Sequence, residues 1–255
     1  MFEISYLVSS PVLFGGGFKV GENENLMFFC SKKIPSITKK AVMAVTGLFL
    51  LGFVLAHMAG NLLIFGGQDL LNSYAQHLED LKPLLWVARI ILLVLVALHI
   101  TTAVQVTMEN RKARPVAYHK AQALQTTYAA RTMAFSGIII LVYIEYHLLH
   151  FTFRVTHPAI SHGIDAQGRR DVYTMVVLSF RSPLLTAFYV FSMALLSMHL
   201  SHGFKSLFQS MGWNHETLEP KLAKISCGLA LVIFAGYSSI PLAVLLGILK
   251  PAGGL

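Results

Sequence analysis

Charged residues are scarce in this chain of 255 residues: Asp, Glu, Lys and Arg make up 13 %, whereas hydrophobic residues make up 55 %. A soluble domain carries about a quarter charged residues. The low charge therefore excludes a disordered chain and an ordinary soluble enzyme, and it predicts a membrane protein. The net charge of +8 does not indicate a nucleic-acid partner, because the basic residues lie between apolar runs and not on one face of a soluble domain.

Cysteine is also scarce. Cys30 and Cys227 lie far apart in the sequence, and neither belongs to a Cys-x-x-Cys pair. A disulfide scaffold, a thiolate metal site and an iron–sulfur cluster carried by this chain are therefore not expected.

Five apolar stretches are long enough to cross a bilayer, which takes about 20 residues as a helix. We expect an all-α membrane protein, a bundle of five transmembrane helices. An N-terminal cytoplasmic segment (1–36) precedes the transmembrane domain (37–255), whose spans are predicted at about 38–65, 83–108, 132–155, 182–208 and 222–249. Short interfacial helices are expected in the connections 69–82 and 115–127.

The basic residues predict the orientation. Thirteen of the 20 Lys and Arg residues lie before the first span, between the second and third, or between the fourth and fifth. Positive charge favours the cytoplasmic side. We therefore expect a multi-pass protein of the bacterial cytoplasmic (inner) membrane, with its N-terminus in the cytoplasm and its C-terminus outside.

Histidines recur in four of the five spans, at His57, His99, His147, His150, His199 and His202. A helix rises about 1.5 Å per residue. Counted from the span ends, His57 and His147 fall at one level near the outer face, and His99 and His199 fall at a second level near the cytoplasmic face. Two such pairs on different helices are what two bis-histidine haem b groups require.

The sequence also allows other interpretations of these histidines. A single intramembrane histidine is often a packed, hydrogen-bonded side chain. Zinc favours ligands gathered at one level, and a proton relay favours acidic partners, of which only Glu145 lies within a span. Spacing alone does not choose between His147 and His150, or between His199 and His202, because residues three apart share a helix face.

Several short segments together resemble the cytochrome b subunit of succinate:quinone oxidoreductases, of the single-subunit, two-haem type. They are Thr46-Gly47-Leu48-Phe49 with 52–58 around His57, Asn72-Ser73-Tyr74-Ala75-Gln76-His77, Ser136-Gly137 ahead of His147, and His199-Leu200-Ser201-His202-Gly203 followed by Met211-Gly212-Trp213. The resemblance runs from about Lys32 to the C-terminus. It implies that the five-helix bundle encloses two haem groups.

The resemblance implies a ligand set that agrees with the depth calculation. His57 and His147 would bind the distal haem, and His99 and His199 the proximal haem. Other polar residues near the haem edges would bind the propionates or support the ligands; the candidates are His150, His202, Arg131, Lys205, Arg89 and Arg154. A quinone would bind polar groups in the outer loop after the first span, for which the candidates are His77, Glu79 and Asp80.

By this resemblance, the chain would anchor a flavoprotein (FAD) subunit and an iron–sulfur subunit of a succinate dehydrogenase or fumarate reductase, and the complex could dimerise. Electrons would pass between the iron–sulfur subunit and a quinone, for which menaquinone is expected; membrane lipid would surround the bundle. Some family members carry a glutamate two residues before the fourth-span ligand, where this chain has Ser197. The alternatives are the cytochrome b subunit of a membrane hydrogenase or formate dehydrogenase, and a haem-free transporter.

Overall fold

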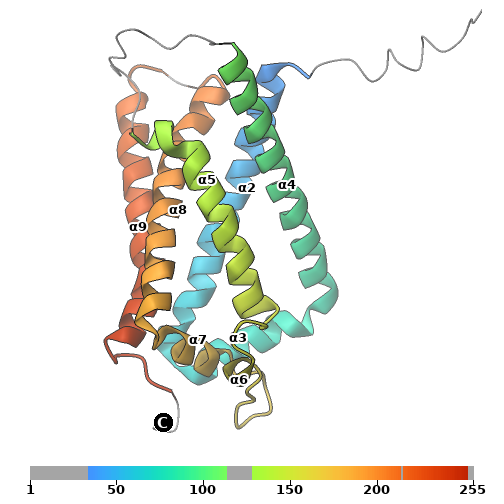
Figure 1. Cartoon of the computed structure of the whole chain (residues 1–255), viewed down its shortest axis with the longest axis vertical. Coiled ribbons are helices and arrows are strands. Elements are labelled where there is room, and N and C mark those ends of the chain that lie inside the picture. Colours follow the sequence, from blue (N-terminus) through green and yellow to red (C-terminus); the bar gives the residue numbers. More distant parts are fainter. Residues whose placement is uncertain (1–33, 114–127, 214, 252–255) are drawn as a thin grey trace, which may run out of the picture. The chain divides into compact units, whose positions relative to one another are not determined.

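The computed structural model describes residues 34–113, 128–213 and 215–251, and the side chains of 128–131 are not described. The long helices in these ranges are α2 (Ser36–Leu62), α4 (Lys82–Lys112), α5 (Tyr128–His147), α8 (Pro183–Ser210) and α9 (Glu219–Leu245) (Figure 1). The shorter elements are η1 (Leu63–Gly66), α3 (Gln68–Asp80), the π-helical turn η2 (Leu148–Thr152), α6 (Pro158–Ser161) and α7 (Val172–Phe180).

The expected all-α, five-helix organisation is confirmed. Within the part of the chain that the structure describes, five helical segments are long and apolar enough to span a membrane: Ser36–Gly66, Lys82–Lys112, Thr132–Thr152, Pro183–Ser210 and Glu219–Leu245. The helix expected in the connection 69–82 is α3. The connection 115–127 and residues 1–33 of the predicted N-terminal segment lie outside the described residues.

Local sequence signals place several helix ends. Ser182 caps α8 by accepting from the amide of Leu185, and Pro183 occupies the first turn, where its missing amide hydrogen costs nothing. Asp171 caps α7 through the amide of Thr174. Gly67, at φ 94°, separates η1 from α3, and that backbone conformation favours glycine.

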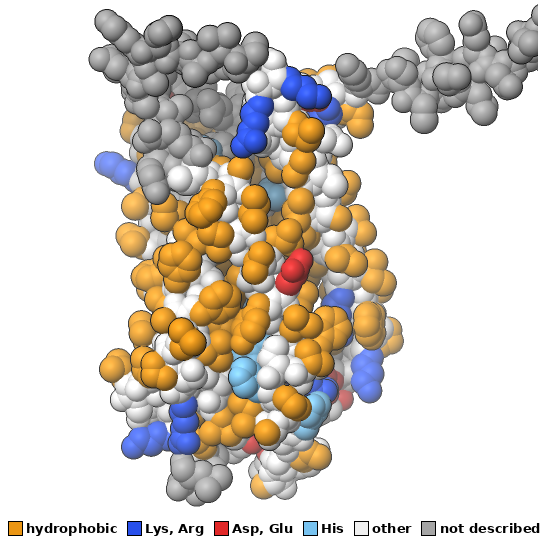
Figure 2. Space-filling view, viewed as in Figure 1, with side chains coloured by type: hydrophobic (Ala, Val, Ile, Leu, Met, Phe, Trp, Pro, Cys, Tyr) orange, Lys and Arg blue, Asp and Glu red, His pale blue; other side chains and the backbone are white. Residues whose placement is uncertain are grey.

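The long helices pack in a definite order. α2 packs against α4 and α8, and α8 packs against α5 and α9. Apolar side chains cover most of the face shown in Figure 2, and its Lys and Arg side chains gather toward the two ends. This distribution is typical of a bundle that lies in lipid.

The buried core lies at the end of the bundle where α3, α6 and α7 lie, which we call the lower end because it is lowest in Figure 1. Its members come from α3, α7, α8, α9 and the segments beside them: Ile64, Leu71, Tyr173, Val177, Phe180, Tyr189, Ile240, Ala243, Val244 and Leu249. The opposite, upper end is where α2 begins. There, Lys39 of α2 forms an ion pair with Glu109 of α4, and Lys205 of α8 forms one with Glu219 of α9.

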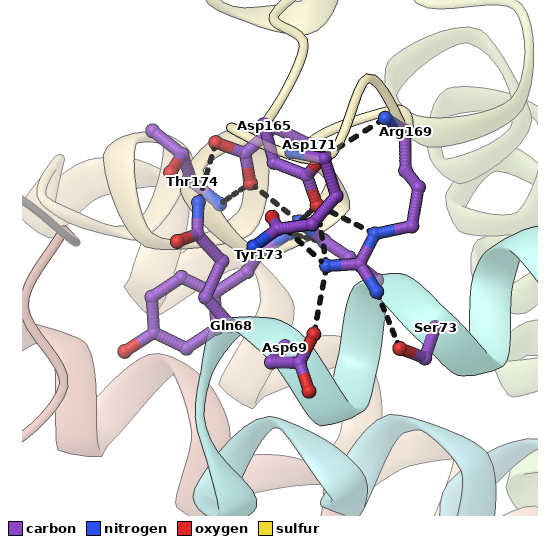
Figure 3. Close-up of polar contacts among 10 residues, drawn as sticks. Gln68, Asp69, Ser73, Asp165, Arg169, Asp171, Tyr173 and Thr174 are labelled. Atoms are coloured by element: carbon purple, nitrogen blue, oxygen red, sulfur yellow. Dashed lines mark hydrogen bonds and ion pairs between the residues drawn. The ribbon is translucent and has the colours of Figure 1, made fainter.

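A polar network holds α3 against the loop between α6 and α7 (Figure 3). Arg169 contacts Asp165 through Nε and Nη2, both at 2.8 Å, and donates from Nη2 to Asp69 of α3 at 2.9 Å. Asn72 is fully buried; its amide donates to both Asp165 and Asp171, each at 3.1 Å. We call these five residues the lower cap.

The lower cap stabilises its carboxylates in the charged form. Burial alone raises the pKa of Asp165, but hydrogen bonds from Arg169, Asn72 and two backbone amides outweigh burial and lower it to about 2. Burial likewise raises the pKa of Asp171, and hydrogen bonds from Thr174, Asn72 and Gln68 outweigh it and lower that pKa below its usual range. Asp165 and Asp171 are therefore charged and hydrogen-bonded at neutral pH.

Candidate functional site: two histidine pairs inside the bundle

His99 of α4 is held by two groups on α2. Its Nδ1 lies 3.2 Å from the carbonyl oxygen of Met43 and 3.2 Å from Oγ1 of Thr46. A carbonyl can only accept, so Nδ1 carries the hydrogen. The Thr46 hydroxyl donates to the carbonyl of Val42 at 2.8 Å and is free to accept from His99. The Nε2 atom of His99 therefore carries a lone pair.

His199 of α8 is held in the same way by α5. Its Nδ1 lies 3.1 Å from Oγ of Ser136, whose hydroxyl donates to the carbonyl of Met133. Since that hydroxyl has one hydrogen, it accepts from Nδ1–H of His199, and Nε2 again carries a lone pair. His199 also lies within electrostatic range of His99. We call His99 and His199 the upper pair.

A glycine follows each of these hydroxyl residues and lies beside the same imidazole. A Cβ atom on Gly47 would meet Cε1 of His99 at 3.2 Å, and one on Gly137 would meet Cε1 of His199 at 3.6 Å. Two hydroxyl–glycine dipeptides, Thr46-Gly47 and Ser136-Gly137, thus hold the two upper histidines. Each dipeptide lies the same distance along the chain before the lower-level histidine of its own helix, which is the sequence signal for this arrangement.

His57 of α2 and His147 of α5 meet at the lower level, and we call them the lower pair. Their ring centroids are 6.0 Å apart, and the rings are nearly perpendicular at 84°. Nδ1 of His147 is buried without a hydrogen-bond partner. A buried, unpartnered imidazole nitrogen is costly, so this side chain is suited to a ligand that the protein alone does not supply.

Aromatic rings surround the lower pair. Phe53 stacks on His57 at a centroid distance of 5.4 Å, and Tyr237 of α9 lies 6.3 Å from the same ring. Tyr143 and Phe151 lie 5.8 and 5.5 Å from His147. Aromatic ring faces and edges thus make up much of the surroundings of the two imidazoles.

Each pair joins two helices that are not among the most closely packed helix pairs of the described residues. The lower pair joins α2 and α5, which both pack on α8; the upper pair joins α4, which packs on α2, to α8. In helix bundles, cofactors are held by side chains from facing helices. Each pair therefore brings together imidazoles from two helices that face each other across the bundle.

The structure gives His147 and His150 of the third span different roles, which their spacing in the sequence could not do. His150 is fully buried, and both ring nitrogens are occupied, Nδ1 by the Tyr189 hydroxyl at 2.9 Å and Nε2 by the Ser179 hydroxyl at 3.0 Å. No lone pair remains for a metal. His202, three residues after His199, is half-buried.

The basic candidates lie apart from one another. Lys205 is paired with Glu219 at 2.7 Å, and Arg89 lies over the exposed ring of Trp86 at 5.1 Å. Arg154 has a φ of 59°, unusual for a residue with a side chain, and its Nη1 donates to the carbonyl of Ser161. The side chain of Arg131 lies outside the described residues.

The polar candidates for a quinone lie on α3 and in the spans. Glu79 forms an ion pair with Arg170, Asp80 accepts from Gln76, and His77 is exposed. Within the spans, Glu145 is exposed, and the Ser197 hydroxyl is buried without a partner.

The histidine side chains are arranged as pairs and not as a compact metal centre. Among the described residues, no group of three or more His, Cys, Asp or Glu side chains is placed to hold one metal ion. Structural and catalytic zinc sites use three or four such ligands at one place. Two facing imidazoles are instead a donor set that would fit the iron of a haem group.

The chain matches no protein-family model, no curated protein and no solved structure.

Proposed function

We propose that this chain is the dihaem cytochrome b subunit that anchors a succinate dehydrogenase or fumarate reductase complex in the membrane and carries electrons between its iron–sulfur subunit and a quinone. The observation that carries the proposal is the presence of two histidine pairs on four helices, one of them with rings 6.0 Å apart. In the other pair, both Nδ1 atoms are hydrogen-bonded, which leaves both Nε2 atoms available.

The residues of the chain would hold and orient the two haems. His57 and His147 would ligate the lower haem, and His99 and His199 the upper one. The hydrogen bonds from Nδ1 to Met43 and Ser136 would fix the ring orientation and make the ligand nitrogen more basic, as hydrogen-bond acceptors beside metal-bound histidines do. When bound, haem supplies one-electron transfer, and the apolar helix faces exclude water from it.

The proposed orientation gives each end of the bundle a role. By the positive-inside rule, the upper end, where Lys39 and Lys205 lie, would face the cytoplasm. The flavoprotein and iron–sulfur subunits would dock there, close to the upper pair. The quinone, expected to be menaquinone, would exchange electrons near the lower pair, and His77, Glu79 and Asp80 on α3 are the nearby polar groups that could exchange its protons.

The first test is a reduced-minus-oxidised absorption spectrum of the purified chain or complex, together with a haem-to-protein ratio. We expect two low-spin b-type haems per chain and copurification of a flavoprotein and an iron–sulfur protein. A colourless protein after expression with adequate haem would overturn the proposal in favour of a transporter. Two haems beside a nickel or molybdenum enzyme would overturn the succinate assignment alone.

A second prediction concerns Gly47. Gly47→Ala places a methyl group 3.2 Å from Cε1 of His99, closer than relaxed packing allows, so the His99 ring must move. We expect an altered spectrum and a shifted midpoint potential for the upper haem, with the lower haem unchanged. Gly137→Ala is the matched control, because its contact with His199 at 3.6 Å is ordinary packing. Equal spectra for both variants and wild type would argue against haem ligation by His99.

A further inference from the structure

We propose that His150 is a positioning residue for His147: it locks the π-helical turn η2 and thereby sets the orientation in which His147 presents its ring to the lower site. This inference rests on the proposed function, because it concerns a ligand of the lower haem. It assigns a role to a fully buried polar side chain that does not itself have a free nitrogen for iron.

A directed chain of hydrogen bonds runs through His150. The Ser179 hydroxyl donates to the carbonyl of Met175 at 2.7 Å, so it accepts from Nε2–H of His150. Nδ1 of His150 must then accept, and the Tyr189 hydroxyl donates to it at 2.9 Å. His150 of η2 is thus fastened to α7 on one side and to α8 on the other, with one tautomer specified.

This chain ends on backbone and does not lead to solvent. Its last acceptor is the carbonyl of Met175 within α7, and Tyr189 at its other end is buried at 5 % exposure. A proton relay would need an exchangeable group at each end. The arrangement instead fits a structural brace, since fully satisfied buried networks specify one geometry.

Two features connect the brace to His147. First, η2 begins at Leu148, directly after His147, and a π-helical turn changes the angle between residues that would share a face in an α-helix. His147 accordingly faces His57, whereas His150 faces α7 and α8. Second, the ring of Tyr189 lies 6.1 Å from His147 and 5.9 Å from His150, so one side chain contacts both.

The sharpest test deletes a single hydroxyl. Tyr189→Phe removes the donor to His150 and leaves the ring contacts in place. Tyr146→Phe is the matched control: its ring also lies beside His150, at 5.7 Å, but the bond to Nδ1 comes from Tyr189. His150→Leu removes the brace, and His150→Gln, which retains a donor and an acceptor, is the conservative rescue.

The readouts are the electron paramagnetic resonance signal and midpoint potential of the lower haem and the rate at which haem passes to a haem-free myoglobin scavenger. We expect Tyr189→Phe and His150→Leu to shift the lower-haem signal and to speed its release about 10-fold, the scale typical of outer-shell partners. The upper haem, Tyr146→Phe and, in large part, His150→Gln should behave as wild type.

The outcomes separate the two proposals. If the wild-type protein contained no haem, the proposed function itself would be overturned. Suppose instead that wild type holds two haems and that the lower haem has the same signal, midpoint potential and release rate in wild type, Tyr189→Phe and His150→Leu. That result would overturn only the positioning role of His150. Equal changes in both haems, or in Tyr146→Phe as well, would also overturn it, because they would indicate a general loss of packing.

Discussion

Replacing one histidine of a pair by alanine is expected to remove one haem and leave the other. His99→Ala and His199→Ala should each lose the upper haem, and His57→Ala and His147→Ala the lower one. If the proposed function holds, each substitution would take away one of the two histidines of a site where the described side chains offer no third metal-binding group to replace it. The haem-to-protein ratio should fall from two to one in every case, with two different residual spectra.

Double variants test the pairing itself. If His99 and His199 bind the same haem, the double variant should retain one haem, as each single variant does, because partners that act as a unit are not additive. His57→Ala combined with His99→Ala should retain none. His162→Ala, an exposed histidine outside the spans, is the control and should retain both. A double variant of one proposed pair that loses both haems would show that the pairing is incorrect.

Exogenous imidazole distinguishes loss of a ligand from loss of the fold. His99→Gly leaves a cavity beside the Met43 carbonyl and the Thr46 hydroxyl that imidazole can enter. We expect imidazole to restore the low-spin spectrum of the upper haem. Restoration would also confirm that the helices around the site remain folded in the variant.

The second large effect is expected at the lower cap. Asn72→Leu removes an amide that donates to Asp165 and Asp171 and a carbonyl that accepts from the amide of Tyr173 at 3.0 Å. Asp165 and Asp171 each lose one of several donors, and the buried amide of Tyr173 loses its acceptor; a buried backbone group without a partner costs about 1–3 kcal/mol. We expect faster proteolysis of the loop between α6 and α7 and a lower unfolding temperature in detergent. Gln76→Ala, which breaks an exposed contact with Asp80 on the same helix, should change little.

The same cap should respond to acid. The pKa of Asp165 in the folded protein is about 2, below the value of about 3.9 expected in the unfolded chain. Its contribution to stability is therefore complete above about pH 4 and is lost as the pH falls toward 2. Asn72→Leu removes one of the hydrogen bonds that lower this pKa, so its acid transition should begin at a higher pH. Coincident acid transitions in the two proteins would contradict the assignment.

The sequence by itself predicted the membrane-spanning bundle, because composition and the length of apolar runs alone decide whether a helix can cross lipid. It also predicted the two levels of histidines, since the helical rise is constant and depth follows from counting. The helix α3 was predicted from the polar segment 69–82 after the first span.

Only the tertiary structure decided what each histidine nitrogen does. Spacing could not separate His147 from His150, because residues three apart share a face of an α-helix, and the π-helical turn η2 breaks that rule. The hydroxyl partners Thr46, Ser136 and Tyr189 come from other helices, and contacts between helices depend on how those helices pack and not on local sequence. For the same reason, the lower cap, in which Asn72 meets residues about a hundred positions later in the chain, could not be predicted from the sequence pattern.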